Sequence, residues 1–390
     1  MVVFITEIVA KFGGRYFGSE EEHQAQLHTK QEFEKHCHTT QLMPFDSALE
    51  AHFQALKIFS VLYGVSLLLY HFSLVSAAIL AVANAVLFLG HFVTYRHWLD
   101  FLFKKKRSHN VIGDIEPTGE VRSTIIIAGH IDSVKEFKWW YRLKHMGAVL
   151  TVVAGFVLSF QAIFLVLAAT IPGPWSIYGW WFFVLCSPIL IVYFDMHDKE
   201  VVHGALDNLT GVAMALEMAK VFSVEQLMHT RVRCISFGAE EAGLRGAYAY
   251  GKKHKKQLLE EKALLINLDT IKDLEHLAIA TRETNTLVGF DKHLISRMAR
   301  SFEFHGIAVK KIPFDIGASD ASAFRILGLP ALSLIGMRTD TLDPCYHTRL
   351  DNLDHLDGTA MEALKQVLVH FITDWDSAHA KEGMQQKENN

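Results

Sequence analysis

Two long apolar tracts interrupt an otherwise ordinary alternation of polar and hydrophobic positions along the chain. Ile58–Tyr95 contains 38 residues and His145–Phe194 contains 50, and neither tract has a single Asp, Glu, Lys or Arg. A helix that crosses a bilayer needs about 20 consecutive apolar residues, so each tract is long enough for two such helices. The sequence therefore predicts two transmembrane helical hairpins, at residues 53–103 and 145–195.

The expected turns of the two hairpins contain polar or helix-breaking residues. The first turn is expected near His71-Phe72-Ser73, and the second at Pro172-Gly173-Pro174, between the spans Met146–Ile171 and Trp175–Phe194. Five tryptophans lie near the ends of the second tract, where aromatic side chains favour the membrane–water interface: Trp139, Trp140, Trp175, Trp180 and Trp181. For the shorter first tract, a hairpin buried in a protein core is the alternative.

Outside these tracts, apolar runs of strand length alternate with amphipathic segments of helix length. Strands are expected at 123–128, 231–237, 263–269 and 331–335, and helices at 212–222, 291–304 and 359–377. Near the N-terminus, Ser19 and Glu22 form a capping-box pattern that opens a polar helix. This order predicts an α/β fold with a mixed, mostly parallel sheet flanked by helices.

The hairpins divide the rest of the chain into separate stretches that we expect to fold as one globular domain. These stretches are residues 1–52, 104–144 and 196–380, and the polar residues 381–390 are expected to form a disordered tail. The two hairpins would then be insertions within this domain.

The composition agrees with a chain that is partly in contact with lipid. Hydrophobic residues make up 50% of the 390 positions, and they include 27 Phe and 7 Trp. A formal net charge of -4 gives no indication of nucleic-acid binding. Four scattered cysteines are too few for a disulfide framework. The opening stretch, Met1–Glu7, lacks a basic region before a cleavable apolar core, so we expect no ordinary signal peptide.

Acidic residues and histidines recur at the carboxyl ends of the predicted strands or in loops beside them. They are His130, Asp207, Glu240, Glu241, Asp269 and His347. In open α/β sheets, ligands bind at this edge. Nitrogen and carboxylate donors together suit Zn²⁺ better than Ca²⁺, and they are too many for one tetrahedral zinc. Two ions about 3.5–4 Å apart, bridged by one carboxylate, account for the number. Taken alone, the Glu240-Glu241 pair would be a solvated helix start.

Six segments resemble, in the same order, the motifs of the co-catalytic di-zinc aminopeptidases. They are Gly129-His130-Ile131-Asp132-Ser133, Gly204–Ala213, Phe237–Gly246, Asn267-Leu268-Asp269, Ser319-Asp320 and Tyr346-His347-Thr348. That family contains the bacterial leucyl aminopeptidases, the glutamate carboxypeptidases and, as a one-zinc offshoot, the glutaminyl cyclases. Gly14-Arg15 with Gly18-Ser19-Glu20 is similar to the family's opening region. The resemblance covers residues 1–50, 108–135 and 200–377.

The resemblance implies two zinc ions per chain. His130 and Asp269 would be the terminal ligands of one ion, and Asp207 would bridge it to the other. Glu241 and His347 would be the terminal ligands of the second ion.

The resemblance also implies roles for residues around the metals. Glu240 would be the general base rather than a ligand, and Asp132 would accept a hydrogen bond from the His130 imidazole and fix its tautomer. Asp320 would either support His347 or act as a helix N-cap. A departure from the soluble relatives is the spacing of 77 positions between His130 and Asp207, which the second hairpin fills.

The function that follows is a membrane-embedded metallo-aminopeptidase acting on peptides. A one-zinc, glutaminyl-cyclase-like acyltransferase and a catalytically inactive membrane scaffold are the alternatives. The sequence leaves open whether the substrate's amino or carboxyl terminus is recognised, and it leaves the oligomeric state open. The expected partners are the lipid bilayer and a peptide substrate, including peptides at the membrane surface, and nucleic acid is not expected.

Basic residues predict the side of the membrane on which the catalytic segments lie. Lys104-Lys105-Lys106-Arg107 follows the first hairpin, and four further basic residues precede the second, namely Lys135, Lys138, Arg142 and Lys144. The opposite turns carry no Lys or Arg. An excess of basic residues near the membrane ends marks the cytoplasmic side, so the sequence predicts four transmembrane helices and a cytoplasmic catalytic domain.

Overall fold

A computed structural model describes residues 1–171, 173–315 and 317–388 of the chain, and side chains as far as residue 378. The chain folds into two compact units. The globular unit comprises residues 1–47, 106–134 and 201–390, and the helical unit comprises residues 48–105 and 135–200. The two predicted hairpins lie inside the two stretches that make up the helical unit. Each unit is described by itself below.

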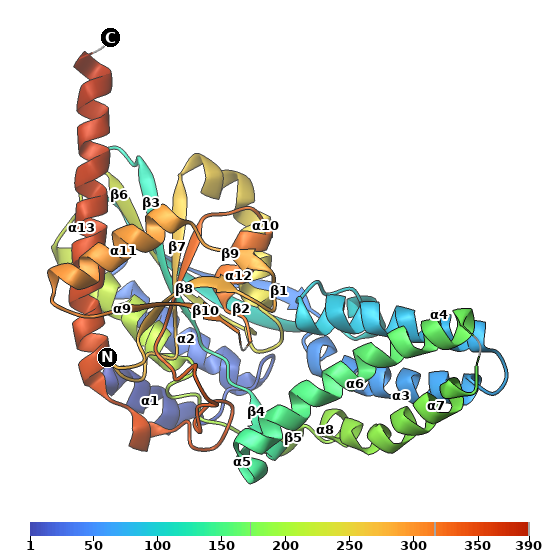
Figure 1. The fold of residues 1–390 in the computed structure, drawn as a ribbon. Helices are drawn as coiled ribbons and strands as arrows, with labels where there is room; N and C mark the ends of the chain where they lie inside the picture. The colour runs from blue at the N-terminus through green and yellow to red at the C-terminus, as the bar shows by residue number, and fades with distance from the viewer. Residues whose placement is uncertain (172, 316, 389–390) are drawn as a thin grey trace. The chain divides into compact units, whose positions relative to one another are not determined.

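A mixed sheet forms the centre of the globular unit (Figure 1). Its strand order is β1-β2-β6-β3-β7-β11-β8-β10, with β9 paired to β8. The strands are β1 (Thr39–Ser47), β2 (Lys106–Ile115), β3 (Ser123–His130), β6 (Thr230–Phe237), β7 (Ala263–Asp269), β8 (Ala278–Glu283), β9 (Val288–Gly289), β10 (Lys310–Phe314) and β11 (Ala331–Ile335). The four central strands β6, β3, β7 and β11 are parallel, whereas β1, β2 and β8 each pair antiparallel with a neighbour. This is the predicted α/β class.

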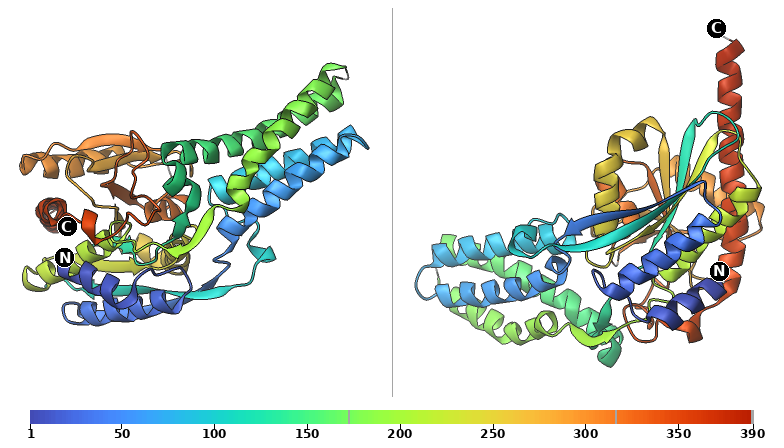
Figure 2. Two further views of the ribbon diagram at one scale, coloured as in Figure 1. Left: turned by 90° about the horizontal axis from the view of Figure 1, so that it is seen from below. Right: turned by 180° about the vertical axis from the view of Figure 1, so that it is seen from behind.

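Helices cover both faces of this sheet (Figure 2). They are α1 (Val2–Phe12), α2 (Glu20–Glu34), α9 (Leu209–Val224), α10 (Arg245–Glu260), α11 (Lys292–Phe304), α12 (Asp320–Ile326) and α13 (Gly358–Glu388). Helix α9 packs closely on the central strands, because Gly129 of β3 and Gly211 of α9 face each other. A Cβ atom added at Gly129 would lie 2.6 Å from the carbonyl carbon of Gly211, so glycine is required for this contact.

The C-terminal helix differs from the sequence prediction. We expected a disordered tail from residue 381, but α13 runs as a helix to Glu388. The predicted tail was inferred from polar composition alone, and helix formation continues there because Lys, Glu, Gln and Met are good helix formers. Residues 389–390 of the predicted tail lie outside the described part of the chain.

The helical unit consists mainly of two apolar hairpins. Its elements are α3 (Ala51–Leu69), α4 (Leu74–Leu87), a π-helical turn (Phe88–Val93), a 3-10 turn (Asp100–Leu102), β4 (Lys135–Phe137), α5 (Lys138–Leu143), α6 (His145–Thr170), α7 (Trp175–Cys186), a 3-10 turn (Ser187–Leu190), α8 (Ile191–Phe194) and β5 (His197–Val201). Within the described residues, four helical stretches are long and apolar enough to cross a membrane: Ala51–Leu69, Leu74–Val93, His145–Thr170 and Trp175–Phe194. The last is interrupted at Ser187-Pro188, because proline cannot continue the α-helical hydrogen bonding.

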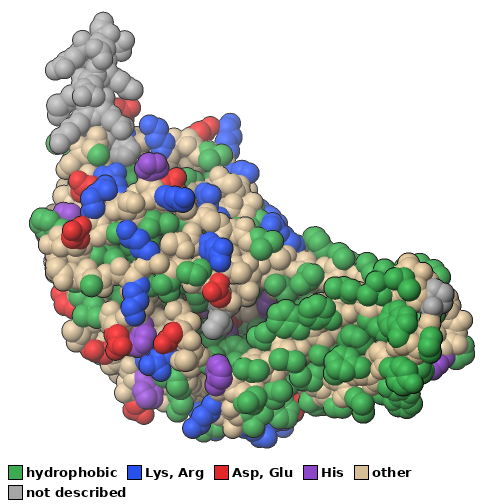
Figure 3. Space-filling model, in the orientation of Figure 1, with side chains coloured by type: hydrophobic (Ala, Val, Ile, Leu, Met, Phe, Trp, Pro, Cys, Tyr) green, Lys and Arg blue, Asp and Glu red, His purple; other side chains and the backbone are tan. Residues whose placement is uncertain are grey.

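Several polar groups of the helical unit form hydrogen bonds inside it, and many apolar side chains lie on its outside. The Tyr63 hydroxyl donates to the Phe183 carbonyl at 2.7 Å, and the Gln161 amide donates to the Tyr63 carbonyl at 3.1 Å. The outer surface is largely hydrophobic (Figure 3), with Ile79 66% and Phe156 56% exposed. This arrangement is typical of helices that pack together within lipid. It also argues against the alternative of a core hairpin, which would bury residues such as Ile79.

Candidate metal centre

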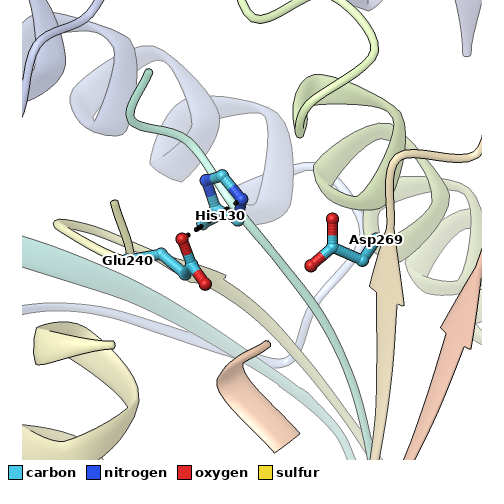
Figure 4. Close-up of side chains that lie close together, drawn as sticks. All are labelled: His130, Glu240 and Asp269. Carbon is cyan, nitrogen blue, oxygen red and sulfur yellow. Dashed lines mark ion pairs between the residues drawn. The ribbon is translucent and has the colours of Figure 1, made fainter. Parts of the chain in front are cut away.

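Six buried or partly buried residues with metal-binding side chains meet at the carboxyl edge of the central strands. His130 is the last residue of β3, Asp269 is the last of β7, and Glu240 follows the end of β6. Figure 4 shows these three side chains converging from three different elements. Asp207 lies just before α9, and His347 lies in the loop after β11. The sixth residue, Glu241, shares the turn of Glu240.

These residues form two neighbouring groups of three. His130, Glu240 and Asp269 each offer one ligand atom, and the three atoms lie within 4.8 Å of one another. The same holds for Asp207, Glu241 and His347. The structure therefore brings together all six residues that the sequence analysis selected, and groups of this kind can hold a metal ion.

The carboxylate of Asp207 lies between the two histidines. Its Oδ1 is 3.2 Å from Nε2 of His130, and its Oδ2 is 3.5 Å from Nε2 of His347. Nε2 of His347 is also 3.2 Å from Oε2 of Glu241, whereas Nε2 of His130 is 3.7 Å from Oε2 of Glu240. One carboxylate that faces both histidines has the position that a bridging ligand requires.

Burial and neighbouring charges shift the pKa values of the ionisable groups in the site. Burial lowers the pKa of His347, but the charges of Glu241 and Asp207 outweigh it and raise the pKa to about 10. Burial, supported by the Asp207 charge, raises the pKa of Asp269 to about 7. Burial also raises the pKa of Glu240 well above its ordinary value. A concentration of buried carboxylates whose ionisation is opposed in this way fits a divalent cation, which would stabilise their charged forms.

Asp132 binds the backbone of the two glutamates and lies beside the histidine ring. Its Oδ1 accepts the backbone N–H of Glu240, and its Oδ2 accepts the N–H of Glu241, each at 3.0 Å. We expected its carboxylate to accept a hydrogen bond from His130, but Oδ1 lies 3.6 Å from Nδ1 of that ring. The backbone carbonyl of Asp132 is closer, at 3.1 Å from Nδ1. Both the carbonyl and the carboxylate of Asp132 thus lie near Nδ1 of His130.

Asp351 binds backbone N–H groups at Asp207, as Asp132 does at the two glutamates. The sequence analysis did not identify Asp351. Its two carboxylate oxygens accept the backbone N–H groups of Leu206 at 2.6 Å and Asp207 at 3.1 Å. Burial and the Asp207 charge raise the pKa of Asp351 to about 8. Asn208 adds a further constraint, because its side chain caps α9 and donates to the Leu268 carbonyl at 2.8 Å.

Arg15 was also missed as a part of the site's framework. Its buried guanidinium donates to carbonyl groups on both sides of the second hairpin, to Ile131 at 2.7 Å and to His203 at 2.6 Å. It also donates to the Gly204 carbonyl at 3.2 Å. These bonds hold the chain just after His130 against the loop that leads to Asp207.

Asp320 takes neither of the two roles that the sequence suggested. Ser319, not Asp320, occupies the N-cap position of α12. The Asp320 carboxylate is fully buried, and neither oxygen has a hydrogen-bond partner among the described residues. Its electrostatic partners include His130 and Asp269, and its charge contributes to the raised pKa of Glu240.

Comparison with known proteins relates about half of the chain to a peptidase family. Residues 189–372 match the model of peptidase family M28, a range that contains every residue of the two groups except His130. The curated aminopeptidase YwaD of Bacillus subtilis (strain 168) is 32% identical over 183 residues, which are 44% of this chain. The chain spans only 38% of the length of that relative.

Solved structures show the same fold. A zinc aminopeptidase from Bacillus subtilis aligns over 96% of this chain and 93% of its own, with 16% identity and a TM-score of 0.58. A glutaminyl cyclase from Porphyromonas gingivalis aligns over 96% of both chains, with 13% identity and a TM-score of 0.57. At such identities the likeness concerns the fold. Residues 189–372 are therefore similar to peptidase family M28, and the fold of the chain is that of zinc aminopeptidases.

Proposed function

We propose that the chain is a membrane-embedded, two-zinc peptidase that releases amino-terminal residues from peptides. The observation that carries the proposal is the position of Asp207, whose two carboxylate oxygens face His130 and His347 separately. A single zinc site would need only one of the two groups of ligands, so the presence of both supports a pair of ions.

The residues divide naturally between the two ions. His130 and Asp269 would hold one ion, Glu241 and His347 would hold the other, and Asp207 would contact both. Zinc bound in this way supplies a bound water of lowered pKa and polarises a carbonyl group.

Glu240 is then left to move protons. It lies farther from Nε2 of His130, at 3.7 Å, than Asp207 does, at 3.2 Å. Its backbone N–H is bound by Asp132, which holds the residue beside the other site residues. In our proposal the carboxylate accepts a proton from the attacking water and delivers it to the leaving amine.

The alternatives make different demands on this site. The glutaminyl cyclase among the structural neighbours keeps the one-zinc chemistry under consideration, but His130 and Asp269 belong to a second group of candidate ligands here. An inactive scaffold would have no use for buried ligands that converge, since each buried carboxylate opposes folding unless it is compensated. Both alternatives predict a metal content or a reaction product that differs from ours.

A peptide panel on the purified full-length protein tests the proposal. Fluorogenic peptides with free or acetylated amino termini are compared, each with zinc and after chelation. We expect zinc-dependent release of the first residue from free amino termini only. Formation of pyroglutamate from amino-terminal Gln would favour the cyclase, cleavage at the carboxyl end would favour a carboxypeptidase, and zinc binding without any turnover would favour the scaffold.

We also propose that the helical unit spans the bilayer four times and that the catalytic unit is cytoplasmic. Four described stretches have the required length and hydropathy. The exposed basic residues Lys104, Lys105 and Arg107 lie next to the end of the first hairpin, and Arg142 and Lys144 lie just before the second. Peptides already at the inner membrane surface would then be the nearest substrates.

A further inference from the structure

The turn that carries both glutamates has an unusual backbone. Ala239 precedes Glu240 and has φ 53, in the left-handed region that side chains other than glycine rarely adopt. Such a conformation persists only where its surroundings hold it. The backbone N–H groups of Ala239, Glu240 and Glu241 are all bound by carboxylates, and the latter two by Asp132.

The carboxylate that binds Ala239 belongs to Glu22 of helix α2. Oε1 of Glu22 accepts the Ala239 N–H at 2.9 Å and the Ser108 hydroxyl at 2.8 Å. Its Oε2 accepts the Gly18 N–H at 2.7 Å. Glu22 is 2% exposed, so a side chain that is normally solvated is enclosed among three hydrogen-bond donors.

This position is not explained by helix capping. The capping-box pattern predicts that Glu22 returns to the backbone N–H of Ser19. Half of the pattern is present, because the Ser19 hydroxyl accepts the Glu22 N–H at 3.2 Å. The Ser19 N–H, however, donates to the Tyr16 carbonyl, and the Glu22 carboxylate extends toward a turn 217 positions away in the sequence.

We propose that Glu22 is a positioning residue that holds Ala239 in its left-handed conformation and thereby directs Glu240 and Glu241 toward the metal centre. The proposal rests on the proposed function for the roles of these two glutamates. Helix α2, which precedes both hairpins in the sequence, would then take a direct part in shaping the site.

Changing Glu22 to Gln tests the role with little change in size. The amide oxygen of Gln can still accept from Ala239 and Ser108, but the NH₂ group then faces the Gly18 N–H. These two donors repel each other. In the flipped orientation the repulsion falls on Ala239 instead. Glu21→Gln is the matched control, because Glu21 is exposed and lies on the same helical turn.

The first measurement is zinc binding by the purified full-length protein. We expect Glu22→Gln to lower the affinity for one of the two ions about 10-fold or more, since residues that orient metal ligands typically contribute about 10–100-fold. The affinity for the other ion and the content at saturating zinc should match those of Glu21→Gln. Unchanged affinity for both ions in a folded variant would overturn the proposal, and this result does not depend on any peptidase activity.

The second measurement separates positioning from general structural damage. At saturating zinc we expect Glu22→Gln to lower kcat about 10-fold or more with little change in KM. In a Glu240→Gln background, the same substitution should change the residual kcat less than about twofold, because the residue through which it acts is already disabled. Equal losses in both backgrounds would overturn the proposal.

If Glu22→Gln does not fold, Ser108→Ala replaces it in both measurements. This change removes one hydrogen-bond donor to Oε1 of Glu22. It should lower the zinc affinity and kcat in the same way as Glu22→Gln, but by a smaller factor. A folded Ser108→Ala protein with wild-type zinc affinity and kcat would contradict the proposal. If wild type lacks peptidase activity, the proposed function fails, while the zinc measurement still decides whether Glu22 positions the turn.

Discussion

Nε2 of His130 lies 3.2 Å from Oδ1 of Asp207, and these two residues flank the second apolar hairpin in the sequence. The other oxygen of Asp207 faces His347. One carboxylate thus connects the two groups of candidate ligands, and its backbone is held in place by Asp351. Although the hairpin separates His130 from Asp207 in the sequence, their side chains lie next to each other in the structure.

Asp207→Asn and Asp269→Asn should therefore affect the metal content differently. The amide of Asp207→Asn leaves the two ions less well shielded from each other, so we expect both to be bound more weakly. Asp269 belongs to the group that contains His130, so Asp269→Asn should weaken mainly one ion. Elemental analysis after dialysis against limited zinc measures this difference.

Loss of only one ion from each variant, with the other bound as in wild type, would show that another residue forms the bridge. Asp354→Asn is a suitable control, because Asp354 is exposed and follows the same loop region as His347. This control should bind zinc like wild type.

Asp132→Asn should lower activity without unfolding the protein. Both oxygens of Asp132 accept backbone N–H groups, so an amide NH₂ group in place of one oxygen would face a donor. We expect a loss of about 10–100-fold in zinc affinity or kcat, the usual range for residues that orient a metal site. Wild-type kinetics and wild-type zinc affinity in Asp132→Asn would show that the turn of Glu240 needs no such support.

The residues of the candidate site could be selected from the sequence because each lies next to a local signal. His130 and Asp269 directly end apolar runs of strand length, and Glu240 follows another. The supporting residues carry no such signal. Glu22 and Asp351 bind backbone N–H groups that are 217 and 144 positions away, and a bond to the backbone leaves no side-chain pattern in the sequence.

The same distinction applies to the fold. The central strands β3 and β7 are buried on both faces, so they appear in the sequence as continuous apolar runs. Strands β2 and β8 were not predicted. Each mixes charged or polar residues with apolar ones, and β2 is an antiparallel addition beside β6 whose pairing depends on distant residues. The hydrophobic pattern therefore predicted the four central strands that position the site, but it did not predict β2 and β8 on either side of them.

Stabilisation by zinc should increase as the pH rises. In the metal-free protein, the pKa of Asp269 is raised from 3.8 to about 7 and that of His347 from 6.5 to about 10. A raised folded-state pKa means that the contribution to stability is complete below the ordinary value and is lost as the pH rises through the folded-state value. The metal-free protein thus loses stability from these groups between about pH 4 and 10.

Zinc needs both groups deprotonated, so it competes with protons at low pH and replaces them at high pH. Thermal unfolding of zinc-loaded and chelated protein, measured side by side from about pH 6 to 8, tests this expectation. The difference between the two Tm values should grow with pH. Because other titrating groups contribute to both forms, a constant or shrinking difference would contradict zinc binding at Asp269 and His347.

The orientation in the membrane can be tested by cysteine labelling. In an otherwise cysteine-free chain, Lys105→Cys should resist an impermeant maleimide in intact cells and react after the cells are opened. His71→Cys, in the turn at the other end of the first hairpin, should show the reverse behaviour. Both positions are exposed, so access to the reagent depends on the side of the membrane.

Labelling of Lys105→Cys in intact cells would place the catalytic unit outside and remove the proposed preference for peptides at the inner surface. Labelling of both positions in intact cells would show that the first hairpin does not cross the bilayer. In that case only the second hairpin would remain as a membrane anchor.

The central claim is that metals held by the other five residues activate water while Glu240 moves its proton. Glu240→Gln keeps the size of the side chain and removes only its ability to accept a proton. We predict that this variant retains about two zinc ions per chain and loses a factor of about 10² or more in kcat. Measuring zinc content and kcat on the same preparation is the most direct test. A parallel loss of zinc and activity would show that Glu240 is a ligand and would contradict the account.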